Sequence, residues 1–172
     1  MNYTDFSSMK KIPNQTYGTC FACGQSNHHG LKLIFYTDDK QVYTNFQVPV
    51  HLAGWSNLVH GGIITTVLDE TIAWTGIFLL QKYMLTKNIH VEFLKPVRVG
   101  QELYSAGLIE EKKTERDIKI SSRIYDSEGT VLARGLGEIK VFSPEFFRKM
   151  GVVSEEYLNS FEQEVFGRTL NC

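Results

Sequence analysis

The chain has 172 residues, with 18 Lys and Arg against 19 Asp and Glu, and 42% of its residues are hydrophobic. This length predicts one domain, and the hydrophobic fraction suffices for a core, which excludes a wholly disordered chain. The net charge of −1 gives no basic footprint, so we expect no nucleic-acid partner. No secretory signal opens the chain, no apolar run approaches the roughly 20 residues of a membrane span, and three cysteines favour a reducing compartment. We therefore expect a soluble cytoplasmic protein with no membrane partner.

The first half of the chain predicts two strands and a long helix. Residues 1–19 have few clustered apolar positions and are interpreted as a loose arm. Alternating apolar positions over residues 31–36 and 42–48 predict the two strands. Residues 63–81 contain no proline and are too long for a strand, so they predict a helix.

The second half predicts an antiparallel arrangement followed by helices. Alternating patterns predict four strands, over residues 85–93, 101–110, 117–125 and 131–142. Ser143 before Pro144 predicts a helix start and Gly151 its end, and Ser154 opens a last amphipathic helix. The predicted division is an arm at 1–19, a domain at 20–142 and a C-terminal helical extension at 143–172.

The long helix is apolar around most of its circumference, so a sheet must wrap around it. One sector, about 100° wide, holds only small residues and one carboxylate: Thr65, Thr66, Asp69, Ala73 and Gly76. Small residues let a second surface approach closely, and a carboxylate in such a sector is costly unless it is paired or used. Asp69 is therefore the residue that needs an explanation.

The sequence His60-Gly61-Gly62 lies directly before the helix. Glycines let a ligand approach the backbone, and the free N–H groups of a helix start favour developing negative charge. A glycine pair alone more often marks a simple turn. Asp69, nine residues after His60, favours a ligand site over a simple turn. An oxyanion site followed by a carboxylate two turns later is typical of acyl transfer.

The segment HGGIITTVLDE (residues 60–70) resembles the hotdog-fold thioesterases, in particular their PaaI-like branch, and residues 20–36 and 85–103 are similar to the flanking segments of that family. The resemblance covers about residues 18–142. It implies an α+β hotdog fold, in which a curved antiparallel sheet of five to six strands wraps one central helix, with the C-terminal helices added. It also implies a homodimer or homotetramer with active sites at the subunit interface. The implied activity is hydrolysis of an acyl-CoA to the free acid and coenzyme A, with no metal and no bound cofactor.

The resemblance also assigns roles to individual residues. The acid nine residues after the His is the catalytic carboxylate of the family, here Asp69, which would act as general base or as nucleophile. The glycine after the His provides the oxyanion N–H, here Gly61 with Gly62 beside it. A hydroxyl early in the next strand corresponds to Thr86. His60 is interpreted as holding the loop through a hydrogen bond.

Two positions near this motif depart from the pattern or compete with it. Some relatives have an Asn six residues before the His, where this sequence has Gly54, and we consider Asn57 as its substitute. Glu70 is the rival acid, interpreted as a carboxylate near the positive end of the helix dipole or as the partner of a basic side chain.

The resemblance places the nucleotide end of coenzyme A near Lys112, Lys113 and Arg116, whose charges suit phosphate. Because glutamates are interleaved with them, a solvated charged turn is almost equally favoured. The competing function is a non-catalytic module that binds acyl-CoA or an acyl carrier.

Cys20 and Cys23 have the spacing of half a zinc knuckle. A closed zinc site needs four ligands, and only His28 and His29 lie nearby in the sequence. Two cysteines that pack a loop are the favoured interpretation, ahead of a zinc-binding interaction protein or a redox pair. The sequence therefore predicts no metal site.

Overall fold

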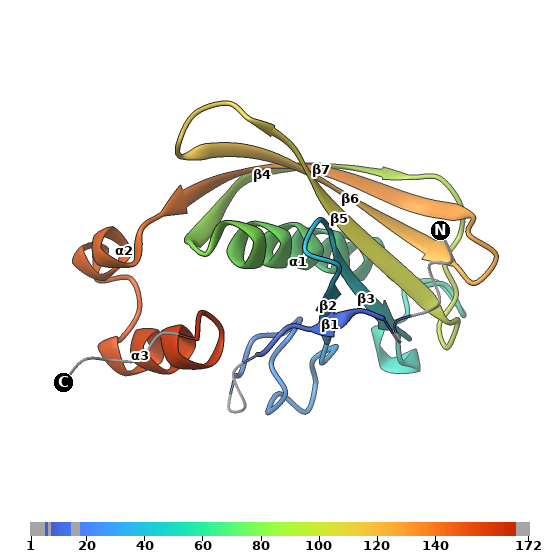
Figure 1. Ribbon diagram of the computed structural model, residues 1–172. Helices are drawn as coiled ribbons and strands as arrows, with labels where there is room; N and C mark the ends of the chain where they lie inside the picture. The colour runs from blue at the N-terminus through green and yellow to red at the C-terminus, as the bar shows by residue number, and fades with distance from the viewer. Residues whose placement is uncertain (1–5, 7, 15–17, 168–172) are drawn as a thin grey trace.

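A computed structural model describes residues 6, 8–14 and 18–167 (Figure 1). The strands of the described residues form one antiparallel sheet in the order β1-β2-β3-β5-β6-β7-β4. They are β1 (Lys10–Lys11), β2 (Phe35–Thr37), β3 (Val42–Phe46), β4 (Tyr83–Phe93), β5 (Leu103–Lys112), β6 (Asp117–Asp126) and β7 (Val131–Phe142). The sheet curves around the helix α1 (Gly61–Leu80). A 3-10 turn, η1 (Val50–Leu52), precedes α1, and the helices α2 (Pro144–Met150) and α3 (Glu155–Glu164) follow β7. The predicted hotdog architecture is confirmed, with seven strands in place of five to six.

Helix α1 forms the core with the concave face of the sheet. Leu68 and Ile72 are fully buried, and the sheet carries glycines where the helix comes closest. A Cβ at Gly107 would lie 2.1 Å from the Thr75 hydroxyl oxygen, and one at Gly137 would lie 3.0 Å from Ile72 Cδ1. By length and composition α1 could cross a membrane, contrary to our expectation that no apolar run reaches that length, but in this fold it packs against the sheet.

The sector of small residues on α1 is shorter than predicted. Thr65, Thr66, Asp69 and Ala73 are half-buried and lie on the open side of the helix. Gly76 is buried instead, because it packs against the sheet. A Cβ at this position would lie only 2.5 Å from Ile139 Cδ1. The surface left for a second molecule is therefore centred on Asp69.

The N-terminal region differs from the predicted loose arm. Residues 10–11 form β1 on the edge of the sheet, and the Ile12 side chain is 1% exposed. The predicted strand over residues 31–36 is also wrong in its first half, because β2 begins only at Phe35. Lys32 has a φ of 52°, which interrupts extended backbone. The N–H groups of Leu31 and Leu33 donate instead to the carbonyl groups of residues 21 and 22.

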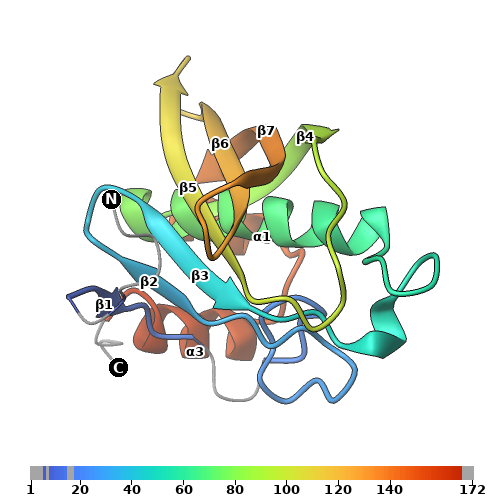
Figure 2. The ribbon, with the colours of Figure 1, turned by 90° about the vertical axis from the view of Figure 1, so that its right-hand side faces the viewer.

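The C-terminal elements agree with the sequence. Strand β7 has the predicted bounds, and α2 begins after a Ser143 cap and ends at Gly151 with a φ of 63°. The hydroxyl of Ser154 caps α3 as expected. Helix α3 and residues 18–34 lie on the side of α1 that faces away from the sheet (Figures 1 and 2), where Trp74 of α1 contacts Phe161 of α3 with ring centroids 6.3 Å apart. The division into arm, domain and extension stays a prediction.

Candidate active site

The start of α1 presents one backbone donor. His60 is the N-cap residue, and its Nδ1 accepts a hydrogen bond from the Gly62 N–H at 3.0 Å. This bond agrees with the interpretation of His60 as the residue that holds the loop. The N–H groups of Ile63 and Ile64 donate to the His60 carbonyl group. In the part of the chain that the structure describes, the Gly61 N–H has no partner, so Gly61 offers the free amide at the positive end of the helix dipole.

The surroundings of this amide are open and partly aromatic. A Cβ at Gly61 would lie 3.5 Å from Phe93 Cζ, an ordinary contact, and the Phe93 side chain is 56% exposed. Gly54 lies against His60, since a Cβ there would come within 3.2 Å of His60 Cα. The backbone therefore leaves little room for a longer side chain at position 54.

Asn57 is tied into the loop before α1. Its side-chain oxygen accepts a hydrogen bond from Arg98 Nη1 at 3.0 Å, and its carbonyl group accepts one from the Val99 N–H at 2.9 Å. These bonds connect the loop to the segment after β4. They give Asn57 a structural part here, and its role in substrate binding stays a prediction.

Asp69 and Thr86 are brought together by the fold. The Thr86 hydroxyl donates to Asp69 Oδ1 at 3.0 Å. Thr86 lies on β4, an edge strand of the sheet, at a bulge between Thr86 and Asn88. The other carboxylate oxygen of Asp69 has no partner among the described residues. The carboxylate is thus oriented by one bond and open on the side where the sheet ends.

Gly61 and Asp69 are far apart within one chain. They are eight positions apart on the same helix, and a rise of 1.5 Å per residue separates them by about 12 Å along the axis. A hydrogen-bond donor and a catalytic base that act on one carbonyl group must both lie within about 3 Å of the reacting atoms. One chain therefore cannot place both groups on the same carbonyl.

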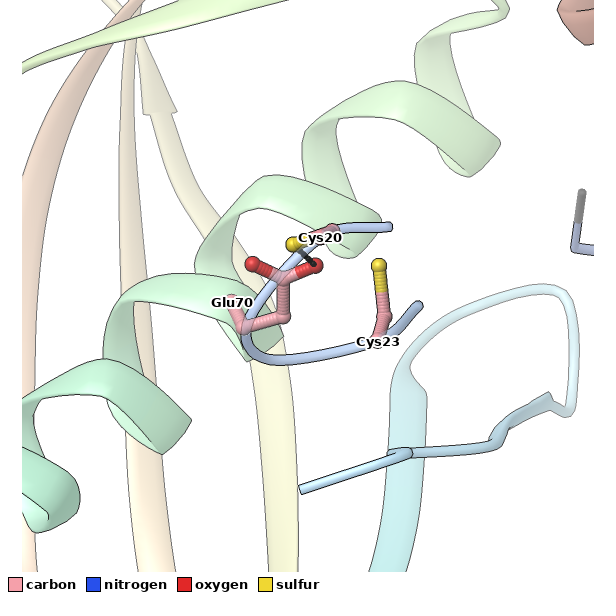
Figure 3. Close-up of side chains that lie close together, drawn as sticks. All are labelled: Cys20, Cys23 and Glu70. Atoms are coloured by element: carbon pink, nitrogen blue, oxygen red, sulfur yellow. Dashed lines mark hydrogen bonds between the residues drawn. The ribbon is translucent and has the colours of Figure 1, made fainter. Parts of the chain in front are cut away.

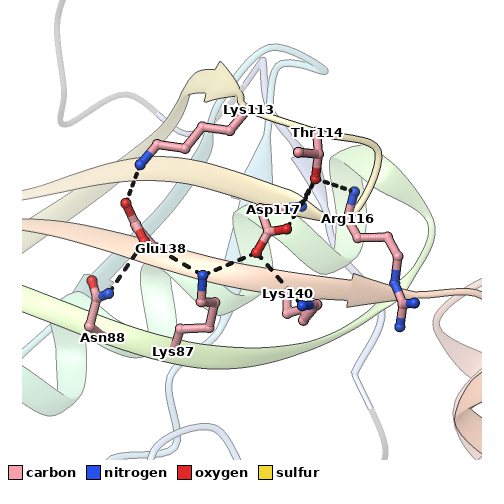
Figure 4. A network of polar contacts seen from close by, with 8 residues as sticks. All are labelled: Lys87, Asn88, Lys113, Thr114, Arg116, Asp117, Glu138 and Lys140. Carbon is pink, nitrogen blue, oxygen red and sulfur yellow. Dashed lines mark hydrogen bonds and ion pairs between the residues drawn. The ribbon is translucent and has the colours of Figure 1, made fainter.

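Lys113 is engaged in a network of charges on the outer face of the sheet (Figure 4). It forms an ion pair with Glu138, and this contact is the main cause that lowers the pKa of Glu138. Lys87 bridges the same Glu138, at 3.8 Å, and Asp117, at 3.1 Å. A phosphate that binds Lys113 would have to compete with this carboxylate.

Arg116 and Lys112 differ in how freely their side chains could bind a phosphate group. The Arg116 guanidinium lies over the Phe146 ring, 4.7 Å from its centroid, and over the Phe142 ring at 5.1 Å. Lys112 has no polar partner in the described part of the chain and lines a cleft of about 520 Å³ together with Lys82. The structure thus separates the three predicted phosphate ligands, and their role in coenzyme binding stays a prediction.

Residues 56–133 match the family model of the thioesterase superfamily. The matched segment is fewer than half of the 172 residues. The matched segment contains the helix start, Asp69 and Thr86, and it ends within β7. A comparison with curated proteins found no match.

Solved structures with the same fold include proteins of three bacteria. The PaaI protein from the phenylacetic acid degradation operon of E. coli has 13% identity over 66% of this chain and 81% of its own, with a TM-score of 0.59. A thioesterase of Haemophilus influenzae has 15% identity over 70% and 85%, with a TM-score of 0.62. A Streptococcus mutans protein bound to acetyl-CoA has 16% identity over 64% and 89%, with a TM-score of 0.60. At such identities the similarity shows the hotdog fold.

Glu70, the rival acid of the thioesterase motif, points away from the open side of α1. Its Oε1 accepts a hydrogen bond from the Trp74 indole N–H at 3.1 Å and lies 3.9 Å from Cys20 Sγ. Burial, followed by the charge of Cys20, raises the pKa of Glu70 to about 7. Of the two interpretations of Glu70, a basic partner is not found among the described residues, where its carboxylate contacts the Trp74 indole and the Cys20 thiol. Fifty residues separate Cys20 from Glu70, so no local pattern could have indicated this contact.

Proposed function

We propose that the protein is an acyl-CoA thioesterase, which hydrolyses a thioester to the free acid and coenzyme A. The observation that carries the proposal is the Asp69–Thr86 pair on the open side of α1, combined with the unpaired Gly61 amide at the start of that helix. The match of residues 56–133 to the family model of the thioesterase superfamily supports it. The acetyl-CoA bound to the Streptococcus mutans protein supports coenzyme A thioesters as the substrate class.

The chemistry follows from these groups. The Gly61 N–H donates to the thioester carbonyl oxygen and stabilises the negative charge that develops there. In one route Asp69 takes a proton from water as the water oxygen attacks the carbonyl carbon. The carbon–sulfur bond then breaks, and the thiolate of coenzyme A receives that proton. In the other route the Asp69 carboxylate attacks the carbonyl carbon, and the carbon–sulfur bond breaks to give an anhydride and the thiolate of coenzyme A. Water then cleaves the anhydride to the free acid and the Asp69 carboxylate, and the proton released protonates the thiolate. Thr86 positions Asp69 in both routes.

We infer that the active site is shared between two subunits. The separation of about 12 Å between Gly61 and Asp69 means that a second chain must supply one of the two groups. Strand β4 borders this side of α1 as an edge of the sheet. Unpaired edge strands are prone to associate with another chain. A homodimer joined along this edge would bring a second helix towards Asp69.

The shared site predicts a dimer or a larger oligomer at micromolar concentration. The half-buried small residues around Asp69 need a second surface to shield them. Light scattering coupled to size-exclusion chromatography should therefore give at least twice the chain mass of 19.6 kDa. A stable and active species of 19.6 kDa would contradict both the oligomer and the shared site.

A panel of acyl-CoA substrates tests the proposed function. Short, medium, long and aromatic acyl-CoAs are mixed with the protein, and the release of coenzyme A is followed with a thiol reagent. Turnover with at least one member supports a thioesterase. Saturable binding across the panel without thiol release would favour the non-catalytic binding module instead.

Loss of the predicted phosphate contacts should raise KM for acyl-CoA. Replacing Lys112, Lys113 and Arg116 together with Ala is expected to raise KM by about tenfold and to lower kcat less, because such contacts bind substrate and transition state alike. KM should also rise with salt concentration. Lys112→Ala alone should reproduce much of the rise in KM, since Lys112 has neither the ion pair that engages Lys113 nor the ring contacts that cover Arg116. Lys40→Ala, on the exposed turn before β3, is the matched charge control, and an equal rise in KM there would exclude a specific contact.

A further inference from the structure

A second cluster of reactive side chains lies on another side of α1, about 100° around the helix axis from Asp69. Cys20 and Cys23, from the loop before β2, face Glu70 of α1 (Figure 3). The two sulfur atoms and a carboxylate oxygen all lie within 4.8 Å of one another, and Cys20 Sγ is 3.9 Å from Glu70 Oε1. Tetrahedral zinc, with bonds of about 2.3 Å to sulfur and 2.1 Å to oxygen, holds its ligand atoms about 3.6–3.8 Å apart. A small contraction of the cluster would satisfy that geometry.

The cysteine loop is built as a fixed turn. The Gly24 N–H donates to the Cys20 carbonyl group at 2.9 Å, and a Cβ at Gly24 would lie 2.4 Å from Cys20 N. The side-chain amides of Asn14 and Gln25 both donate to the Cys23 carbonyl group at 2.9 Å. The two sulfur atoms are therefore held in place before any ligand binds.

The loop favours a thiolate at Cys20 and a neutral thiol at Cys23, because the hydrogen bond with Cys20 and burial both raise the pKa of Cys23. A hydrogen bond from the Cys23 thiol is the main cause that lowers the pKa of Cys20 to about 5, and burial opposes this shift. The backbone N–H groups of residues 22, 23 and 24 lower the pKa of Cys20 further, because they are directed at its sulfur. A thiolate is the form of cysteine that binds metal ions. Zinc binding would therefore release the Cys23 proton.

Among the described residues, the groups with the strongest electrostatic influence on this cluster are acidic. The groups that act most strongly on the pKa values of Cys20, Cys23 and Glu70 include another carboxylate, Asp69, and no Lys, Arg or His. The Trp74 indole fixes the Glu70 carboxylate in its orientation towards the sulfurs. Orienting bonds of this kind are typical of the groups around metal ligands.

We propose that Cys20, Cys23 and Glu70 bind one zinc ion, with water as the fourth ligand. Thiolates select zinc over magnesium or calcium, and two thiolates with one carboxylate form a complete set of protein ligands for a four-coordinate site with one open position. The ion would join the segment of residues 18–34 to the middle of α1. The site would thereby stabilise the helix that carries Asp69, on a face about 100° around the axis from that carboxylate.

Metal content of the full-length reduced protein tests the proposal. Purified protein loaded with zinc and then dialysed should retain about one zinc per chain. Cobalt, used as a spectroscopic probe, should give the near-ultraviolet absorption of a cobalt–thiolate bond. Cys20→Ser, Cys23→Ser and Glu70→Gln should each weaken zinc binding by about 100-fold or more, because each removes a ligand. Asp69→Asn and Cys172→Ser are the matched controls and should bind zinc like the parent.

Thermal unfolding gives a second readout. Zinc at about 100 times its Kd should raise the Tm of the parent by roughly 5–10 °C, and the Cys20→Ser and Glu70→Gln variants should not respond. Circular dichroism without metal establishes that these variants are folded. Reduced parent protein that binds neither zinc nor cobalt would overturn the proposal. The same holds if the Glu70→Gln variant binds zinc as tightly as the parent, or if Cys20 and Cys23 form a disulfide whose reduction restores no zinc binding.

Discussion

Replacing Asp69 with Asn should lower kcat by about 10²–10⁴-fold, which is the usual loss when a general base is removed. The amide retains the volume of the carboxylate and can still accept a hydrogen bond from Thr86, so the fold should survive. It can neither take a proton from water nor attack a carbonyl carbon. Oligomeric state and affinity for coenzyme A should stay close to those of the parent, and steady-state kinetics with the best substrate of the acyl-CoA panel measures the loss.

Glu70→Gln is the control for this variant, because it makes the same chemical change one position along the helix. Glu70 has a pKa raised to about 7, and a shifted pKa of this kind often marks a catalytic group. Its carboxylate nevertheless points towards Cys20 and Trp74, away from the open side of α1. Turnover should therefore persist in Glu70→Gln. The assignment of the acid is wrong if this variant loses turnover while Asp69→Asn keeps it, and carboxylate catalysis fails altogether if both are fully active.

The fold was predictable wherever its causes are local. The apolar run of α1, the alternation over residues 131–142 and the serine caps of α2 and α3 each depend on neighbours within a few positions. The same holds for the helix start, where His60 binds the Gly62 N–H two residues away. Short-range periodicity and capping suffice to specify such elements.

Contacts between distant segments were not predictable in this way. Residues 31–34 have the alternation of a strand, but the N–H groups of Leu31 and Leu33 bind the cysteine loop, and Lys32 adopts a positive φ. The Lys113–Glu138 ion pair joins the turn after β5 to β7, and the register of the intervening β6 against β7 is not specified by the sequence. The Glu70–Cys20 contact depends on how the N-terminal segment crosses α1. Each of these is decided by tertiary packing, which overrides the local pattern.

The role of the Gly61 amide can be tested by a substitution that replaces the hydrogen of its N–H with a ring carbon. Proline has no N–H and is well tolerated at the first position of a helix. His60 already has a ψ of 135°, which suits a residue before proline. Gly61→Pro should therefore fold and should lose about 10²–10³-fold in kcat, as expected when one oxyanion donor is removed. Gly61→Ala retains the N–H, and its Cβ would lie 3.5 Å from Phe93 Cζ, so it should retain most of the activity.

Mixing the two inactive variants tests whether two chains share one site. In a dimer of Asp69→Asn with Gly61→Pro, one site receives the intact Gly61 amide from the first chain and the intact Asp69 from the second. The other site has neither. Random reassortment of equal amounts makes half of the dimers mixed, so about a quarter of the parent activity should return. The recovery should appear after the chains are unfolded and refolded together, and should be absent when they are refolded separately and then combined without exchange. If both groups acted within one chain, every chain in the mixture would lack one of them, and the mixture would stay as inactive as its components.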